Sequence, residues 1–444
     1  RQISFAIAPK VSDRFRVALM ATYDDRNQSD KQIAFGDMVH LLLPERDFTP
    51  IQNPYLPGTP LRPNSPVFYG RERLYNFIAE NAGGISQRNV LILIGHRRTG
   101  KTSALLRLED RLPSHLLPVY IDCQSLGVLP GMPALFNDIS WLIADVLATK
   151  NIEIEVPEPE DWLADPTGLF QRKFLPYVRS FLPKDTRLLL VFDEFEAFES
   201  LVDDKILPPT FFTFLRHMMQ HMEGLGFVFV GTHRLEAMSA NYWSVLFNIA
   251  LYDRIRYLSE DAAIQLITEP VEPNLIYDDL ALDKILRVTA GHPYFLQLVC
   301  YTVVKRANML RSGYITISDV NACLDEMLSL GEVHFAYLWQ RSSYTERAIL
   351  TAVAHMMDQD VTFHPEDFSE YLQSYGIHLN PTEVTAALNS LVEREIMRED
   401  ASGATVQYEL HIGLVGLWVA QHKSLSKLHA DNPQLEKRPL PQQF

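Results

Sequence analysis

The stretch that decides the fold is NVLILIGHRRTGKT, Asn89–Thr102. Its first half is short, apolar and rich in β-branched residues, which is typical of a buried strand. Its second half matches the pattern G-x-x-x-x-G-K-[S/T], and the run Ser103–Glu109 after it is typical of a helix. A glycine-rich turn between a strand and a helix lets backbone N–H groups surround phosphate oxygens at the helix N-terminus. We therefore predict a phosphate-binding P-loop; a chance match on a helix cap is the weaker alternative.

Two residues carry the chemistry predicted for this loop. Lys101 would reach the β- and γ-phosphates of a nucleotide, and Thr102 would bind Mg²⁺. Arg97 and Arg98, inside the loop, either contact phosphate or face solvent. The other residues predicted to bind the nucleotide here are Gly95, Thr99, Gly100 and Ser103. The expected cofactors are ATP or ADP, together with Mg²⁺.

A second apolar run, Arg187–Phe192, ends in Asp193 and Glu194. This is the Walker B pattern, which delivers carboxylates to the carboxyl edge of a parallel sheet, where such sheets bind ligands. Asp193 would hold Mg²⁺, and Glu194 would be the base that polarises the attacking water. An ordinary acidic cap after a buried strand is the alternative, and the upstream P-loop makes it the minor one. Glu196 and Glu199 follow on the next predicted helix, where we expect a solvated surface.

Composition limits the classes of protein to consider. The 444 residues are 47% hydrophobic and 21% charged, which fits a globular protein of two to four domains. No apolar run approaches the ~20 residues of a membrane-spanning helix, so no membrane partner is expected. The three cysteines have no metal-binding spacing, which favours a reducing cytosol. The net charge of −15 disfavours a general nucleic-acid coat. The sequence begins at Arg1 rather than Met, as a fragment would.

The chain divides by composition and periodicity into six segments. The predicted class is α/β: a P-loop parallel sheet with helices on both faces, then a helical domain and a winged-helix domain. We expect a β-sandwich-like segment over 1–45, a proline-rich linker over 46–66, the nucleotide-binding domain over 67–258, the helical domain over 259–338, the winged helix over 339–428 and a flexible tail over 429–444.

The nucleotide-binding domain alternates strand and helix patterns. Its strands are predicted at 90–94, 117–122, 187–192, 226–231 and 253–258, and its helices at 71–82, 101–111, 133–149, 167–181 and 209–223. The acidic stretch 150–166 is predicted to be a solvated loop. In the N-terminal segment, strands are predicted at 3–7, 15–23 and 32–43.

The last part of the chain is predicted to be mostly helical. The helical domain should contain helices at 260–267, 279–290, 294–310 and 317–330, the last of them capped at Ser318 and Asp319. The winged helix should contain helices at 345–355, 365–375 and 380–394, wing strands at 396–399 and 406–410, and a closing helix at 414–425.

Two further motifs accompany the P-loop and Walker B patterns. Val67–Glu72 has the form hydrophobic-Gly-Arg-Glu, and Gly291-His292-Pro293-Tyr294 has the form Gly-x-Pro. With these four motifs, roughly residues 53–425 resemble the STAND branch of P-loop ATPases, relatives of AAA+ proteins and archaeal-type ATPases. The resemblance implies that Gly70 and Arg71 help hold the base and sugar, and that Pro293 packs on the nucleotide. A proline ring is a rigid apolar surface suited to an adenine.

Other candidates carry less specific signals. Thr232 or His233, at the end of the fourth predicted strand, could be a γ-phosphate sensor or a plain strand cap. Arg254 and Arg256 could be arginine fingers, although surface positions are the better interpretation. His411 stands near where some relatives of that family place an ADP-contacting histidine, but a structural histidine is the better interpretation.

Three functions are considered. The resemblance implies an ATP-hydrolysing switch in the cytoplasm, closed with ADP, which opens and self-associates after ATP exchange and acts on an unknown protein effector in signalling or defence. The alternative is a DNA-associated ATPase of the origin-recognition kind. The candidate recognition helix, 380–394, disfavours it because it offers Glu383 and Glu393 and few basic residues. A scaffold without turnover is disfavoured by the presence of both Asp193 and Glu194.

Overall fold

The computed structural model describes residues 14–23, 31–40, 48–82, 90–128, 131–232, 250–356, 362–402 and 406–430. The chain separates into two units, residues 1–50 and 51–444. In the first unit, β1 (Arg14–Tyr23) and β2 (Lys31–His40) form an antiparallel pair. The strand predicted at 3–7 lies outside the described residues. The described part of the segment is thus a two-stranded antiparallel sheet.

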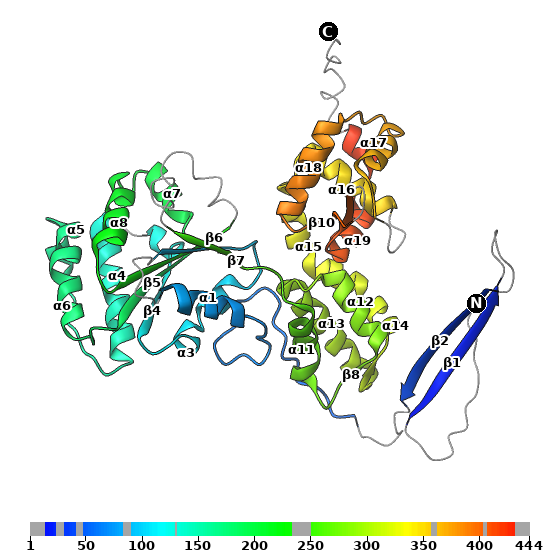
Figure 1. Cartoon of the computed structure of the whole chain (residues 1–444), viewed down its shortest axis with the longest axis horizontal. Helices are drawn as coiled ribbons and strands as arrows, with labels where there is room; N and C mark the ends of the chain where they lie inside the picture. The colour runs from blue at the N-terminus through cyan, green and yellow to red at the C-terminus, as the bar shows by residue number, and fades with distance from the viewer. Residues whose placement is uncertain are drawn as a thin grey trace, which may run out of the picture. The chain divides into compact units, whose positions relative to one another are not determined.

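The second unit is built on a parallel sheet of five strands in the order β4-β5-β6-β3-β7 (Figure 1). Ile92 on β3 lies opposite Phe229 on β6 and Tyr252 on β7. The strands are β3 (Val90–Ile94), β4 (Leu116–Asp122), β5 (Arg187–Asp193), β6 (Leu225–Gly231) and β7 (Leu251–Arg254). The predicted α/β class is confirmed. The fifth strand was predicted at 253–258, whereas β7 begins at 251 and ends at 254. Only these four residues pair with β3.

Helices cover both faces of the sheet because the strands are apolar on both sides. On β3, Ile92 packs into the core beneath α4 and α8, whereas Leu91 and Leu93 pack into the core beneath α1 and α2. The helices of this domain are α1 (Glu72–Ala82), α2 (Lys101–Leu105), α3 (Leu108–Arg111), α4 (Gly131–Ala148), α5 (Pro166–Leu169), α6 (Leu175–Ser180), α7 (Ala197–Asp203) and α8 (Thr210–His221), with short helical turns at Ser125–Val128, Pro159–Trp162 and Phe170–Phe174.

The loop predicted to be solvated is partly a core element. Trp162 is completely buried, and Ile152, Ile154 and Val156 pack against the same core as α4. The intervening acidic residues are exposed, as in an extended segment whose alternate side chains face inward. The stretch 150–166 therefore packs against the core on the α4 side of the sheet rather than lying free in solvent.

The helical region follows β7. Its elements are α11 (Glu260–Thr268), a helical turn at Glu269–Val271, β8 (Ile276–Tyr277), α12 (Asp279–Thr289), α13 (Pro293–Leu310), β9 (Tyr314–Ile315), α14 (Ile317–Ala322) and α15 (Leu324–Gln340). The predicted cap at Ser318 and Asp319 is wrong in position: Thr316 is the N-cap, and it forms a reciprocal capping box with Asp319.

The last region has the winged-helix order of elements. These are α16 (Tyr344–Met356), α17 (Pro365–Gln373), α18 (Pro381–Glu393), β10 (Met397–Asp400), β11 (Gln407–Leu410), α19 (Gly413–His422) and α20 (Leu425–Ala430). The antiparallel pair β10–β11 forms the wing. Phe368, Leu388 and Trp418 are buried in the core of this region. Within the described residues, none of the helices is both long and apolar enough to span a membrane.

Candidate functional site

The P-loop runs from β3 into α2, with Gly100 just before the helix. Gly100 has a φ of +85°, a conformation that glycine adopts without steric cost. Lys101 turns back over the loop, and its Nζ donates to the carbonyls of Gly95 and His96, each at 3.2 Å. Lys101 is only 4% exposed. The ammonium group is therefore held inside the turn that would surround a phosphate.

Asp193, at the end of β5, is fixed by three donors. Its Oδ2 accepts hydrogen bonds from Thr102 Oγ1 at 2.7 Å and from Tyr120 OH at 3.1 Å, and its Oδ1 accepts one from the Glu194 N–H at 3.0 Å. Burial raises the pKa of Asp193 above its ordinary value, and the hydrogen bonds from Thr102 and Tyr120 oppose that rise. A hydroxyl and a carboxylate side by side are hard oxygen ligands suited to Mg²⁺.

Sequence reasoning missed Tyr120. It lies on β4, opposite Val191 of β5, so its hydroxyl reaches Asp193 from the neighbouring strand. The only available signal was a polar side chain near the end of a predicted parallel strand. That signal does not specify which strand will be the neighbour of β5.

Glu194 follows Asp193 with a φ of +50°. Its Oε1 lies 3.7 Å from Lys101 Nζ. Burial raises the pKa of Glu194, while the charge of Lys101 opposes the rise. A carboxylate with a raised pKa, next to the phosphate-binding loop, is suited to take a proton from water.

Glu196 is not the solvated residue that we predicted. Its Oε1 accepts hydrogen bonds from the N–H and the hydroxyl of Thr232, at 3.0 and 2.7 Å. Its Oε2 is buried and has no hydrogen-bond partner among the described residues. The positive φ of Glu194 turns the chain after β5, and Glu196 is thereby directed to the end of β6 rather than to solvent.

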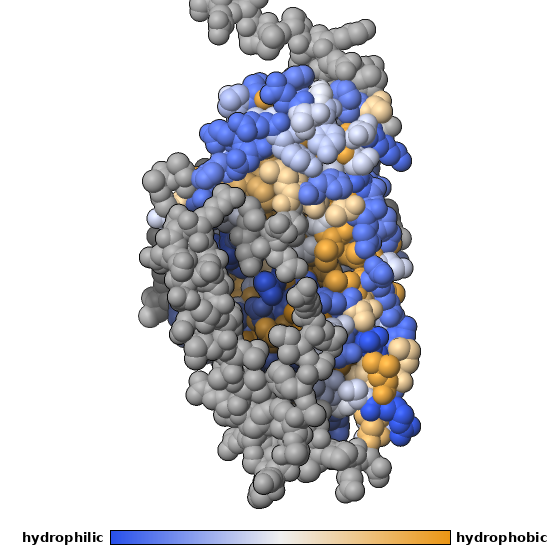
Figure 2. Space-filling view, turned by 90° about the vertical axis from the view of Figure 1, so that its right-hand side faces the viewer, coloured by the Kyte–Doolittle hydropathy of each residue, from blue (hydrophilic) through white to orange (hydrophobic). Residues whose placement is uncertain are grey.

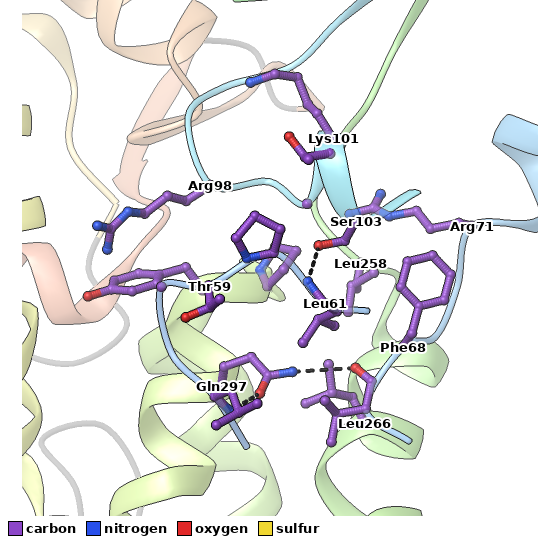
Figure 3. Close-up of a pocket in the computed structure, with 18 of the residues that line it drawn as sticks. Thr59, Leu61, Phe68, Arg71, Arg98, Lys101, Ser103, Leu258, Leu266 and Gln297 are labelled. Atoms are coloured by element: carbon purple, nitrogen blue, oxygen red, sulfur yellow. Dashed lines mark hydrogen bonds between the residues drawn. The ribbon is translucent and has the colours of Figure 1, made fainter. Parts of the chain in front are cut away.

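A cavity of about 290 Å³ adjoins these groups. It lies between the P-loop, the start of α13 and the proline-rich segment, and Figure 3 shows its walls. The predicted site residues that line it are Arg71, Arg97, Arg98, Gly100, Lys101, Thr102, Ser103, Glu194 and Pro293. Gly70, Gly95, Thr99 and Asp193 lie beside it in the chain but do not line it.

The proline-rich segment is a wall of this cavity, which the prediction of a linker did not anticipate. Residues 56 and 58–61 line the cavity. The Leu61 N–H donates to Ser103 Oγ on α2 at 3.0 Å, as Figure 3 shows. At the other end, the buried Tyr55 OH donates to the carbonyls of Leu266 and Ile267 at the end of α11. We call residues 51–62 the strap, because they connect the helical region to the P-loop helix.

Arg71 has a structural role that was not predicted. Its Nη2 donates to the Thr99 carbonyl at 2.6 Å, and its Nη1 donates to the Arg256 carbonyl at 2.8 Å. Burial lowers the pKa of Arg71 to about 10, so it remains charged at neutral pH. Arg71 thus joins the P-loop to the segment after β7. The contact with base and sugar implied by the family resemblance remains a prediction.

Gly70 allows the segment before α1 to pack closely against α11. Its φ is +71°, and a Cβ added there would lie 2.3 Å from the Cβ of Ala262 on α11. Glycine is therefore required by packing at this position, whatever contact it makes with a ligand.

Aromatic and amide side chains from α13 complete the cavity. The guanidinium of Arg98 lies over the ring of Tyr294, 4.3 Å from its centre. Gln297 accepts a hydrogen bond from the Leu56 N–H at 3.1 Å and donates to the Val67 carbonyl at 3.4 Å. Gln297 therefore holds the strap and the segment before α1 at a fixed separation.

The P-loop also contacts the winged helix. His96 Nε2 donates to the Glu393 carbonyl at the end of α18, at 3.0 Å, and lies 3.9 Å from Glu395 Oε2. Tyr257, on the segment after β7, donates to the Glu395 carbonyl at 3.2 Å. The turn after α18 is thus bonded to the nucleotide-binding domain at two points.

The remaining predicted candidates are spread around this contact. His233 lies outside the described residues. Arg256 takes part through its carbonyl in the bond to Arg71, and Arg73 pairs with Asp253 beside Arg254. His411 does not line the cavity; its Nδ1 donates to the Glu395 carbonyl at 3.2 Å, and burial lowers its pKa. These contacts fit the structural role that we considered the better interpretation for His411.

The exposed part of α18 offers little positive charge. Arg394, at its end, points inward to Glu346 at 3.1 Å and to the Leu338 carbonyl at 3.3 Å. Glu383 serves the capping box at the other end. Figure 2 shows a largely hydrophilic surface over the winged-helix end, with hydrophobic residues gathered below it.

The comparisons with known proteins bear on this geometry. Residues 84–238 match the family model described as an AAA domain. This part of the chain is an AAA-type P-loop ATPase domain. No curated protein matches the chain. The match includes the P-loop, Tyr120, Asp193 and Glu194, so the AAA domain carries the phosphate-binding and carboxylate groups described above.

The fold is similar to solved structures. A Walker-type ATPase of Pyrococcus abyssi has 15% identity and a TM-score of 0.56, and the match covers 79% of this chain and 96% of that one. The Aeropyrum pernix ORC2 protein, solved in ADPNP–ADP complexes, has 15% identity and a TM-score of 0.48, covering 82% of this chain and 92% of that one. At 15% identity, the similarity to the Pyrococcus abyssi ATPase shows a similar fold alone.

Proposed function

We propose that this protein is an ATP-hydrolysing switch of the STAND type, in which the nucleotide controls the contact between the P-loop and the winged helix. The observation that carries the proposal is the hydrogen bond from His96 to the Glu393 carbonyl. A residue of the phosphate-binding loop thereby holds the end of α18. A change in the conformation of the loop on nucleotide exchange would directly alter this contact with the winged helix.

The hydrolytic step would use the groups around Asp193. Thr102 and Asp193 would hold Mg²⁺, which when bound neutralises charge on the phosphates. Lys101 would bind the β- and γ-phosphates, and Arg97 and Arg98 line the same cavity. Glu194 would take a proton from the attacking water. The burial that raises its pKa strengthens it as a base.

The coupling between the bound nucleotide and the winged helix would start at Lys101. Its Nζ donates to the carbonyls of Gly95 and His96. Phosphate oxygens would compete with these two carbonyls for the Lys101 ammonium group, and the loop around His96 would then change its position. We propose that ADP keeps His96 on Glu393, whereas ATP breaks the contact, frees the winged helix and permits self-association and binding of a protein effector.

A DNA-associated ATPase remains the alternative function. It would need cations on the exposed face of α18 for phosphate contacts. The inward direction of Arg394 and the glutamates on α18 favour a protein contact instead. ATP turnover measured with and without duplex DNA separates the two: strong stimulation by DNA would support the alternative.

The first experiment identifies the nucleotide that the freshly purified protein releases on denaturation. Stoichiometric ADP supports the closed switch. An empty site with steady turnover contradicts it. Lys101→Ala should abolish nucleotide binding, because it removes the main phosphate cation; unchanged binding would remove the P-loop from the proposed site.

Hydrogen exchange then tests the coupling. We expect slow exchange over residues 381–395 with ADP, and faster exchange in Glu194→Gln saturated with ATP. His96→Ala should give fast exchange with either nucleotide. The exposed histidine of the same region, His378, provides the control variant His378→Ala. Equal exchange of this segment in every nucleotide state would refute the switch.

A further inference from the structure

A second cavity, of about 240 Å³, lies where the P-loop, α15 and the winged helix meet. Arg97 lines both this cavity and the first one. The side of the second cavity toward the nucleotide-binding domain is formed by His96 and Arg97 of the P-loop and by Thr232, directly after β6. Since Arg97 lines both cavities and Lys101 of the same loop lines the first, the second cavity adjoins the loop that would bind the phosphates.

The lining is cationic in a protein whose net charge is −15. Three arginines line it, Arg97, Arg341 and Arg394, against a single carboxylate among the described lining residues, Glu346. Glu346 is already occupied: it lies 3.1 Å from Arg394 Nη1 and also accepts hydrogen bonds from Ser390 Oγ and the Ser343 N–H, each at 2.6 Å. The charges of Glu346 and Arg394 cancel.

The two remaining arginines both lie near one tyrosine ring. The guanidinium of Arg97 lies 4.6 Å from the centre of the Tyr337 ring, and that of Arg341 lies 5.5 Å from it. Neither guanidinium is within ion-pair distance of a carboxylate in the described part of the chain. Two cations near one ring repel each other, and an anion within reach of both would relieve that repulsion.

Two of the histidines that line the cavity, His292 and His334, do not add to this repulsion. Burial and the charges of Arg98 and Arg97 lower the pKa of His334 to about 3, and burial also lowers the pKa of His292. Both rings are neutral at physiological pH, and each neutral ring offers one N–H donor. The cavity combines guanidinium groups with neutral N–H donors, and both are donor types that bind phosphate oxygens.

We propose that this second cavity binds inorganic phosphate, the product of ATP hydrolysis, between Arg97 of the P-loop and Arg341 at the end of α15. The inference rests on the proposed function, since it takes the phosphate from that reaction. In the reaction, water attacks the γ-phosphorus, the bond from the β,γ-bridging oxygen to that phosphorus breaks, and ADP, phosphate and a proton result. Phosphate held here would connect the P-loop to α15 while ADP remains in the first cavity.

The test is equilibrium dialysis of radiolabelled inorganic phosphate against the full chain saturated with ADP and Mg²⁺. We expect phosphate to bind, and Arg341→Ala to weaken it by about three- to tenfold, a modest loss because both arginines are exposed. Arg341→Lys should keep part of the affinity. Lys305→Gln removes an exposed cation on α13, paired with Glu326, and should have no effect.

Three results would overturn the proposal. One is the absence of phosphate binding while ADP still binds. Another is equal phosphate affinity in wild type and Arg341→Ala, which would put the phosphate in the first cavity. The third is a loss of affinity in Arg341→Ala for a non-hydrolysable ATP analogue but not for phosphate, which would assign Arg341 to the γ-phosphate of bound nucleotide. Failure of ADP itself to bind would instead refute the proposed function.

Discussion

Thr102 Oγ1 donates to Asp193 Oδ2 at 2.7 Å, and this bond joins the P-loop helix to the end of β5. The two residues belong to strand–loop units that are not neighbours, since β6 lies between β3 and β5. All these strands are parallel, so their carboxyl ends meet at one edge. The metal ligands proposed for this protein are therefore brought together by the order of the strands in the sheet.

Tyr120→Phe should weaken the response to Mg²⁺. The variant removes one of the two donors to Asp193 Oδ2, so the carboxylate loses part of its fixed position. Hydrogen bonds to charged groups contribute about 1.5–3 kcal/mol, and half-burial of this one suggests the lower end. We expect the half-saturating Mg²⁺ concentration for ATP turnover to rise about tenfold. Tyr75→Phe, whose hydroxyl donates to the Ala104 carbonyl, is the control. An unchanged Mg²⁺ titration would contradict a positioning role.

Glu194→Gln should retain ATP and lose hydrolysis. The amide keeps the size of the side chain but cannot take a proton from water. Loss of a general base typically lowers the rate by about 10²–10⁴-fold. Turnover and bound nucleotide are measured on the same preparation. Glu199→Gln, five residues further along the chain on α7, carries the same charge change and should hydrolyse ATP normally. Full activity in Glu194→Gln would mean that another group is the base.

The pH dependence of turnover should report the environment of Glu194. Burial raises its pKa above the ordinary 4.5. Because the base must be ionised, the rate should fall as pH decreases through this raised pKa. The acid limb should therefore lie at higher pH than for an exposed glutamate. The measurement is kcat against pH at saturating ATP and Mg²⁺. A limb at or below 4.5 would show that burial does not govern this group.

Gly70→Ala should destabilise the fold more than Gly58→Ala. Both glycines have positive φ, +71° and +89°, so both variants carry backbone strain. At Gly70 the new Cβ would also lie 2.3 Å from Ala262, whereas at Gly58 the nearest atom is 3.8 Å away. Overpacking of this kind costs about 1–3 kcal/mol in addition. Urea unfolding of the two variants measures the difference. Equal stability would mean that α11 can shift without cost.

Tyr55→Phe should loosen the strap. The variant removes a buried hydroxyl that donates toward two helix carbonyls, and it leaves those carbonyls without this donor. A loss of about 1–2 kcal/mol in the free energy of unfolding is expected. Nucleotide affinity should also fall, because the strap lines the cavity. Tyr375→Phe, at an exposed tyrosine of the winged helix, is the control. Unchanged nucleotide affinity would show that the strap does not contribute to nucleotide binding.

Much of the nucleotide-binding domain could be predicted from the sequence. The run Val90–Ile94 and the glycines of the loop after it have strict local requirements, and the predicted boundaries of β3 match the structure. The alternation of strands and helices indicated a parallel sheet because parallel strands need crossover helices. The capping position at Thr316 was missed, since Ser318 is an equally good capping residue by type and only the backbone conformation distinguishes the two.

The sequence by itself determined which residues form the P-loop and which carboxylates follow β5, because those functions depend on residue type within a few positions of one another. Tertiary structure alone decided that Tyr120 reaches Asp193, that Glu196 holds Thr232, that the strap walls the cavity and that His96 contacts Glu393. Each of these contacts joins segments far apart in the chain. Their partners are set by strand order and by the packing of α13, α15 and α18 around the P-loop, which leave no periodic or local pattern in the sequence.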